Sequence, residues 1–160
     1  MIADVNSQFR TSPAEDVRTD KEISRVFEAA DGQAALEQLR DEHYDVLITE
    51  LVMPKMDGLD LLDRLRIDSI NRPPVIIVAS YMRNDSLLQR AFAKGASYVM
   101  LKPVEPEFLH KRMKDLLENC IADQEMAVHQ GSGVKSLDEK ITTIFLTVGI
   151  PAHIKGYHYL

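Results

Sequence analysis

The stretch that decides the fold is YDVLITELVMPKMDG, residues 44–58. Apolar residues follow one another without a polar break at positions 46–48, which is typical of a short strand buried on both faces of a parallel sheet. Glu50 stands at the carboxyl end of this strand, and a loop with the turn signals Met53-Pro54 and Asp57-Gly58 follows it. In open α/β sheets, ligands and reacting groups lie beyond the carboxyl ends of the strands. Glu50 is therefore the first candidate site residue.

Strands and helices alternate on both sides of this segment. Apolar runs predict further strands over 23–30, 75–78 and 98–101, and a stunted first strand at the amino terminus. Apolar residues at helical spacing predict the intervening helices, which we expect around 35–39, over 58–68, from a cap at Asn84 or Asp85 to a stop at Gly95, and over 105–121. This alternation predicts right-handed βαβ units and a doubly wound, five-stranded parallel α/β sheet covered on both faces.

Residues 7–22, where the first helix is expected, give a poor signal. They hold few apolar residues, and Pro13 would break a helix that began before it. In the alternative interpretation Ser12 caps a late helix, Pro13 is its first residue and Glu15 lies in its first turn.

Composition excludes several classes of protein. The net charge of −6 disfavours nonspecific binding to nucleic acid or to an anionic membrane. The single cysteine, Cys120, allows no internal disulfide and indicates a reduced, cytoplasmic protein. No run reaches the ~20 apolar residues of a membrane span, and no secretory signal is visible. The histidines lack metal-ligand spacing, and neither a phosphate-binding glycine loop nor a nucleophile elbow occurs, so we expect no enzymatic activity.

The last forty residues differ from the rest. Residues 122–135 are polar, contain Gly-Ser-Gly and predict a linker. Residues 136–139, SLDE, form a capping box, and apolar residues at helical spacing follow it up to a stop at Gly149. A second, helical segment is therefore expected to begin at residue 136.

Residues 2–121 resemble a response-regulator receiver domain, which implies a flavodoxin-like fold. The blocks that carry the resemblance are IADVN, ADG, DVLITELVMPKMDG, VIIVAS and GASYVMLKP, at 2–6, 30–32, 45–58, 75–80 and 95–103. Residues 136–160, and above all the run GIPAHIKGY, are similar to the opening of the effector domain of the stage-zero sporulation regulators of endospore-forming bacteria. The DNA-reading helix-turn-helix of that family would lie further on, so the resemblance implies a chain truncated after the start of its effector domain.

The resemblance also implies a phosphorylation site. In this family an aspartate attacks a phosphoryl group, and Mg²⁺ is held by that aspartate, by an acidic pair after the first strand and by a backbone carbonyl. The family also has a lysine that adds positive charge, a switch hydroxyl that binds the phosphoryl group and a switch aromatic residue that moves in response. Three of these positions keep their group here, namely the first acid Asp4, the carbonyl of Val52 and the lysine Lys102. Four positions are substituted: Val5 replaces the second acid, Glu50 the acceptor, Ala79 the switch hydroxyl and Val99 the switch aromatic residue.

These substitutions predict a degenerate receiver that has kept the fold and lost the phosphorylation switch. Val5 removes a ligand, so Asp4, Glu50 and the Val52 carbonyl are expected to hold Mg²⁺ weakly at most, and no cofactor is expected. Glu50 carries its oxygens ~1.5 Å farther out. A misplacement of ~1 Å can cost about 10²-fold in a positioned reaction. Ala79 cannot transmit a phosphoryl signal.

Other interpretations stay open at this stage. Glu50 either mimics a phosphorylated aspartate or pairs with Lys102 near Asp4, and the missing switch hydroxyl favours the pair. The expected partners are proteins of a phosphorelay or of a sporulation regulator, with self-association as a further possibility, and neither DNA binding by this chain alone nor membrane binding is expected. The rivals are a response regulator that can still be phosphorylated, a fragment of a DNA-binding sporulation transcription factor, and a nonfunctional truncated product.

Overall fold

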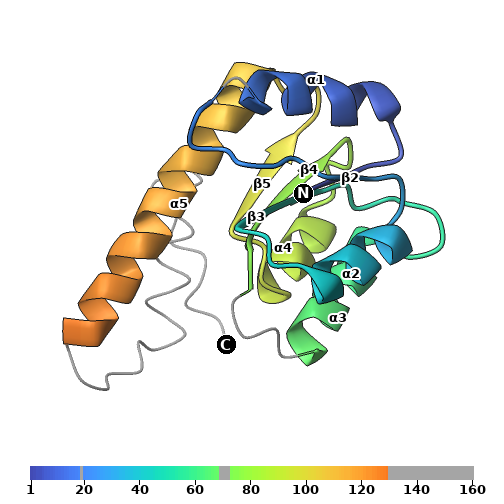
Figure 1. The fold of residues 1–160 in the computed structure, drawn as a ribbon. Helices are drawn as coiled ribbons and strands as arrows, with labels where there is room; N and C mark the ends of the chain where they lie inside the picture. The colour runs from blue at the N-terminus through green and yellow to red at the C-terminus, as the bar shows by residue number, and fades with distance from the viewer. Residues whose placement is uncertain (19, 69–72, 130–160) are drawn as a thin grey trace, which may run out of the picture. The chain divides into compact units, whose positions relative to one another are not determined.

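The computed structural model describes residues 1–18, 20–68 and 73–129, and Met1–Ile121 form one compact unit (Figure 1). The strands are β1 (Ile2–Ala3), β2 (Glu28–Ala29), β3 (Val46–Thr49), β4 (Val75–Ser80) and β5 (Tyr98–Leu101). The helices are α1 (Ser7–Arg18), α2 (Gly32–Asp41), α3 (Gly58–Ile67), α4 (Asp85–Ala93) and α5 (Pro106–His129).

The five strands form one parallel sheet in the order β2-β1-β3-β4-β5. This topology confirms the predicted doubly wound α/β fold. The chain leaves β1 toward one edge of the sheet and returns on the other side of β1 as β3, so the strand order reverses between these two strands. Such a reversal point opens a crevice at the carboxyl ends of the strands.

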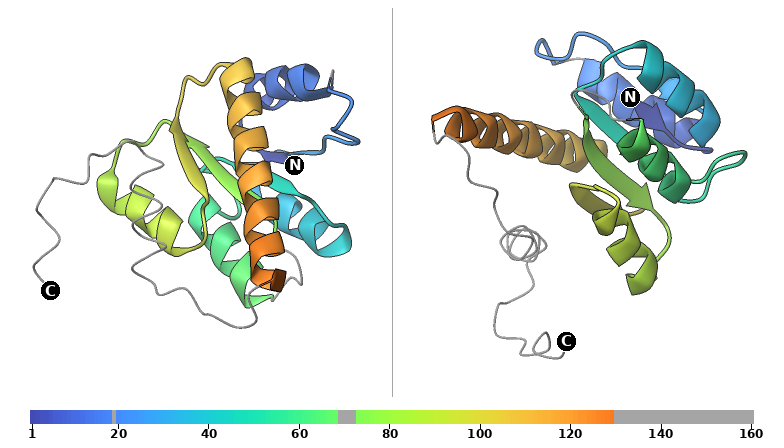
Figure 2. Two further views of the ribbon diagram at one scale, coloured as in Figure 1. Left: turned by 90° about the vertical axis from the view of Figure 1, so that its left-hand side faces the viewer. Right: turned by 90° about the horizontal axis from the view of Figure 1, so that it is seen from below.

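Helices cover both faces of the sheet (Figures 1 and 2). On one face Ala14 of α1 and Leu109 of α5 pack on alternate strand residues such as Ile48 and Ile77. On the other face α2, α3 and α4 pack on the intervening residues, including Leu47. Alternate side chains of a strand point to opposite faces, so each unbroken apolar run supplies both cores.

The first helix begins earlier than the late start that Pro13 suggested, and that interpretation is wrong. Asn6 caps α1, since its Oδ1 accepts a hydrogen bond from the N–H of Gln8 at 2.9 Å and its carbonyl accepts one from Arg10 at 3.1 Å. Pro13 therefore lies inside the helix, where it donates no backbone hydrogen bond, but its ring is buried. The burial of that ring offsets part of the cost of the missing bond.

The second strand is shorter than predicted. The run 23–30 contains only the two strand residues of β2, because its single neighbour, β1, is itself two residues long. The apolar side chains of Ile23 and Val26, which suggested a longer strand, instead pack against the core beneath α1 and α5.

The last described helix is longer than predicted. The sequence ended it at residue 121, but α5 continues to His129, so residues 122–129 of the predicted linker are helical. The rest of that linker and the expected helix after residue 136 lie outside the described residues. Neither α5 nor any other helix in the described part of the chain is long and apolar enough to cross a membrane.

A charged cluster joins the α1–β2 connection to α5. Asp20 Oδ2 lies 2.7 Å from the Lys114 ammonium and 2.9 Å from His110 Nε2, and the same ammonium lies 2.9 Å from Glu22. The hydrogen bond from Lys114 lowers the pKa of Asp20 to about 2. The pairing thus fixes α5 on the same face of the sheet as α1.

Replacing Pro13 by alanine should stabilise the protein. The change restores a hydrogen bond to the carbonyl of Phe9 and removes a clash within α1, while it loses some buried ring surface, so we expect the free energy of unfolding to rise by about 1–2 kcal/mol. Denaturant unfolding measures the change. Pro106 is the matched control because it is the first residue of α5, where no helical bond is missing. A Pro106→Ala gain equal to that of Pro13→Ala would contradict this account.

Candidate functional site

The candidate site lies where the sheet strands end. Asp4 follows β1, Glu50 follows β3 and Lys102 follows β5. Only 1% of Asp4, 5% of Glu50 and 4% of Lys102 is exposed to solvent. Charged residues are rarely buried to this degree unless they are paired.

The Lys102 ammonium lies between the two carboxylates, as the sequence predicts. It donates a hydrogen bond to Oε2 of Glu50 at 2.8 Å and another to Oδ2 of Asp4. The remaining carboxylate oxygens accept backbone bonds, Oε1 of Glu50 from the N–H of Leu51 at 2.7 Å and Oδ1 of Asp4 from the N–H of Asn6 at 2.8 Å. Each of the four oxygens therefore has a donor. We call Asp4, Glu50 and Lys102 the ion triad.

A second cation, Arg10, stands beside the ion triad. Its Nη1 donates to the backbone carbonyls of Asp4 at 2.7 Å and Val5 at 3.2 Å, and its Nε lies 3.5 Å from a carboxylate oxygen of Glu28. The guanidinium thus fixes the turn between β1 and α1 and adds positive charge next to the buried Asp4. Sequence reasoning missed Arg10, because its reach depends on where α1 begins.

Two aromatic rings that the sequence analysis also missed lie against Lys102. The ammonium is 4.1 Å from the centre of the Phe9 ring and 5.3 Å from that of the Tyr81 ring. Both distances are within the range of a cation–π interaction. Neither ring carries a motif, and only the register of α1 and the path of the chain after β4 bring them to the lysine.

Two glycines hold the loop after Glu50 close to its neighbours. A Cβ on Gly58 would lie 2.3 Å from the carbonyl oxygen of Glu50, and one on Gly32 would lie 2.3 Å from that of Met56. Asp31 anchors the same loop through the Lys55 ammonium at 2.7 Å, and this hydrogen bond holds the pKa of Asp31 below its ordinary value. The loop is thus tied to the start of α2 as well as to its own strand.

The substituted positions lie around the ion triad without joining it. Val5 and Val52 are exposed at 57% and 61%, so the family's second acid is replaced by an apolar side chain facing solvent. Ala79 is fully buried in the core under α1 and α5, and Val99 packs against the core on the other face. The hydroxyl of Ser80, next in sequence, is also buried and accepts a hydrogen bond from the N–H of Met82 at 3.2 Å.

The residues at this crevice do not fit a magnesium ion. Mg²⁺ needs several oxygen ligands in near-octahedral geometry. The oxygens of Asp4 and Glu50 are already bound by Lys102 and by backbone N–H groups, and Val5 supplies none. In the described part of the chain, no three His, Cys, Asp or Glu side chains gather where they could hold a metal ion.

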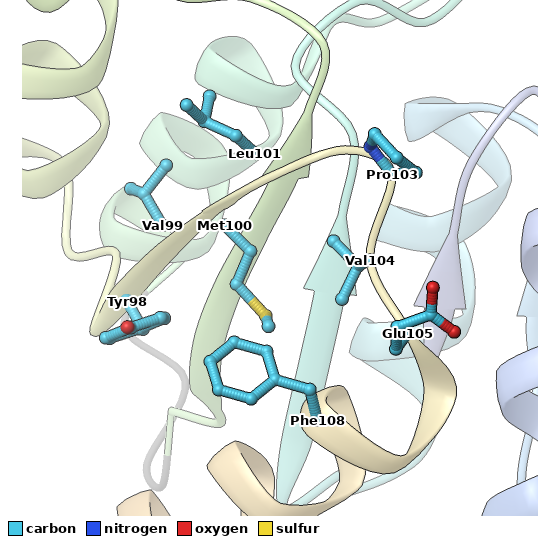
Figure 3. Close-up of a pocket in the computed structure, with 8 residues that line it drawn as sticks. All are labelled: Tyr98, Val99, Met100, Leu101, Pro103, Val104, Glu105 and Phe108. Atoms are coloured by element: carbon cyan, nitrogen blue, oxygen red, sulfur yellow. The ribbon is translucent and has the colours of Figure 1, made fainter.

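A hollow that none of the ion-triad side chains lines lies on β5 and the start of α5 (Figure 3). It is open to solvent, has a volume of about 380 Å³ and is mostly apolar. Met100 and Phe108 face each other across it. The guanidinium of Arg112 lies 4.6 Å from the Tyr98 ring at its edge. Its lining is formed by Tyr98, Val99, Met100, Leu101, Pro103, Val104, Glu105 and Phe108.

Comparisons with known proteins agree with this fold. Residues 1–114 match the family described as response regulator receiver domain. The chain is similar to the receiver domain of AraT, a response regulator from Geobacillus stearothermophilus, with 30% identity, a TM-score of 0.66 and coverage of 77% of this chain and 95% of that one. The receiver domain of the response regulator NarL from Mycobacterium tuberculosis is 25% identical, with a TM-score of 0.67 and coverage of 73% and 93%. The Vibrio cholerae chemotaxis protein CheY4 is 25% identical, with a TM-score of 0.65 and coverage of 72% and 94%.

Removing the lysine of the ion triad should destabilise the fold strongly. Lys102→Met leaves Asp4 and Glu50 buried without a counter-charge, and breaking a buried pair in this way costs about 3–5 kcal/mol of unfolding free energy. Glu50→Gln in the same chain should recover a large part of that loss, because one buried charge remains instead of two. Denaturant unfolding at pH 7 measures both variants.

Lys55→Met is the matched control. Lys55 pairs with Asp31, but its side chain is largely exposed, so its loss should matter much less than that of Lys102. Equal destabilisation by the two lysine variants, or no recovery with Glu50→Gln, would contradict the role given to the ion triad.

Proposed function

The chain belongs to the family of response regulator receiver domains, and from that premise we propose that it is a degenerate receiver, a signalling module that is not phosphorylated at Glu50. It transmits signals through contacts with other proteins and not through a phosphoryl switch. We further place it with the sporulation response regulators.

One observation carries the proposal, namely that the ion triad is already complete. In a receiver that accepts phosphate, the acidic crevice has to hold a metal ion and present a carboxylate to the phosphoryl donor. Here the carboxylate of Glu50 is held by Lys102 and by the N–H of Leu51. Either oxygen of Glu50 would have to attack while it accepts a buried hydrogen bond, which withdraws charge from it and makes it a weaker nucleophile.

The substitutions away from the ion triad support the same proposal. Ala79 has no hydroxyl to bind a phosphoryl group, and Val99 has no ring to move in response. Val5 offers the metal no oxygen. A phosphoryl group at position 50 would thus lack a metal, a hydroxyl partner and a residue that reports its presence.

The assignment to the sporulation regulators rests on residues 136–160, which lie outside the described part of the chain. Their sequence resembles the opening of an effector domain, and it contains two acids and two lysines, hence no basic surface for DNA. We therefore propose protein partners of a phosphorelay or of a sporulation regulator, and self-association, as the interactions of this chain.

Acetyl phosphate with Mg²⁺ tests the proposal directly. Intact mass should show no phosphoryl adduct on the wild-type chain. Glu50→Asp alone should also stay unmodified, because Val5 still lacks the metal ligand. Val5→Asp combined with Glu50→Asp should restore some modification, since Val5 is exposed and an aspartate there is readily hydrated.

Val5→Asp combined with Glu50→Asn is the matched control, because it restores the acid and removes the acceptor. It should remain unmodified. An adduct on the wild-type chain that disappears in Glu50→Gln would overturn the proposal and favour the phosphorylatable rival.

Duplex binding separates the proposal from the transcription-factor rival. We expect the 160-residue chain to show no specific binding to a sporulation-type operator at physiological salt, because its net charge is −6 and residues 136–160 hold no excess of basic residues. Fluorescence anisotropy with a labelled operator duplex and a scrambled duplex measures this. Nanomolar binding to the operator alone would support the rival.

A further inference from the structure

The ammonium of Lys102 is more thoroughly buried than its two ion pairs account for. The side chain of this lysine is 1% exposed. An ammonium has three N–H donors, and Asp4 and Glu50 accept two hydrogen bonds from it. Two carboxylates do not surround an ammonium, so other groups also contribute to its burial.

The rings of Phe9 and Tyr81 provide this cover from two different elements. Phe9 lies in the first turn of α1, is half-buried and packs against the core beneath α1 and α5. Tyr81 follows β4 directly, and 63% of it is exposed. Phe9 is therefore the fixed wall of the cover, and Tyr81 is its outer, solvent-facing part.

We propose that Phe9 and Tyr81 form an aromatic lid that closes the crevice over Lys102 and keeps anions and reactive small molecules from its ammonium. An aromatic face attracts a cation and offers no oxygen that would compete with the carboxylates. By excluding water, the lid also strengthens the pairing within the ion triad. The inference rests on the proposed function, which it deepens, since a covered lysine cannot pair with an incoming phosphoryl group.

Amine acylation with acetic anhydride measures the accessibility of each lysine. Peptide mass spectrometry resolves the reaction of Lys102 from that of Lys111, an exposed lysine of α5 that serves as reference within each molecule. In the wild-type chain Lys102 should react at least about tenfold more slowly than Lys111, as expected for a desolvated cation held by carboxylates and rings.

The contribution of the lid appears when its rings are removed and both carboxylates are kept. Tyr81→Ala and Phe9→Ala should each raise the Lys102 rate several-fold relative to Lys111, whereas Tyr81→Phe, which keeps the ring, should not. Phe108→Ala is the matched control, because Phe108 is half-exposed on α5 and lies against Arg112, not against Lys102.

The acylation rate of Lys94 reports unfolding. Lys94 pairs with Asp63 in the native protein, so it should be acylated slowly in any variant that remains folded. If Phe9→Ala also speeds the acylation of Lys94, that variant is unfolded and Tyr81→Ala is the test of the lid. The Tyr81 ring lies outside the core, so its removal should not unfold the protein. The lid hypothesis is overturned if wild-type Lys102 reacts as fast as Lys111, or if Tyr81→Ala leaves its rate unchanged in a folded chain. Acylation reports access and not phosphorylation, so a phosphoryl adduct on the wild-type chain would overturn the proposed function while slow Lys102 acylation still supported the lid.

Discussion

The pairing of the Lys102 ammonium with two buried carboxylates is the constraint on which the rest of the structure depends. Its three members follow three strands of the sheet, so β1, β3 and β5 have to end at one level. β1 is only two residues long, and the backbone bond from the N–H of Glu50 to the carbonyl of Ala3 holds it beside β3 at 2.9 Å. The ion triad and this short strand therefore stabilise one another, because a slip of β1 by one residue would turn Asp4 to the other face.

The extra methylene of Glu50 suits this structural role. Its carboxylate reaches the Lys102 ammonium with one oxygen and the N–H of Leu51, in its own loop, with the other. These two hydrogen bonds fix the orientation of the buried Glu50 carboxylate. A phosphoacceptor needs the opposite arrangement, with one oxygen free and aimed at an incoming phosphorus atom. This arrangement of the side chain is consistent with the proposed loss of the phosphoacceptor role.

The sequence predicted the parts of this fold that depend on local pattern. The apolar runs of β3, β4 and β5 located the central sheet, and because parallel strands end at one edge, they also placed Glu50 near Lys102. The pattern left the start of α1 open between residue 7 and Pro13, because the burial of the Pro13 ring, which offsets part of the cost of a proline inside the helix, depends on tertiary packing. The length of β2 depends on its partner strand, and the contacts of Phe9 and Tyr81 with Lys102 depend on tertiary packing. Such contacts have no periodic signal.

The charges in the crevice bear on the proposed weakness of a metal site there. Asp4 and Glu50 bring two negative charges to the strand ends and Lys102 brings one positive charge, while the guanidinium of Arg10 next to Asp4 is paired with Glu28. A divalent cation that took carboxylate oxygens from the ammonium would leave it beneath two aromatic rings with fewer carboxylate partners. The cost of leaving that buried ammonium poorly paired would oppose such an exchange. In this receiver domain the retained lysine is therefore the internal counter-ion of the acids.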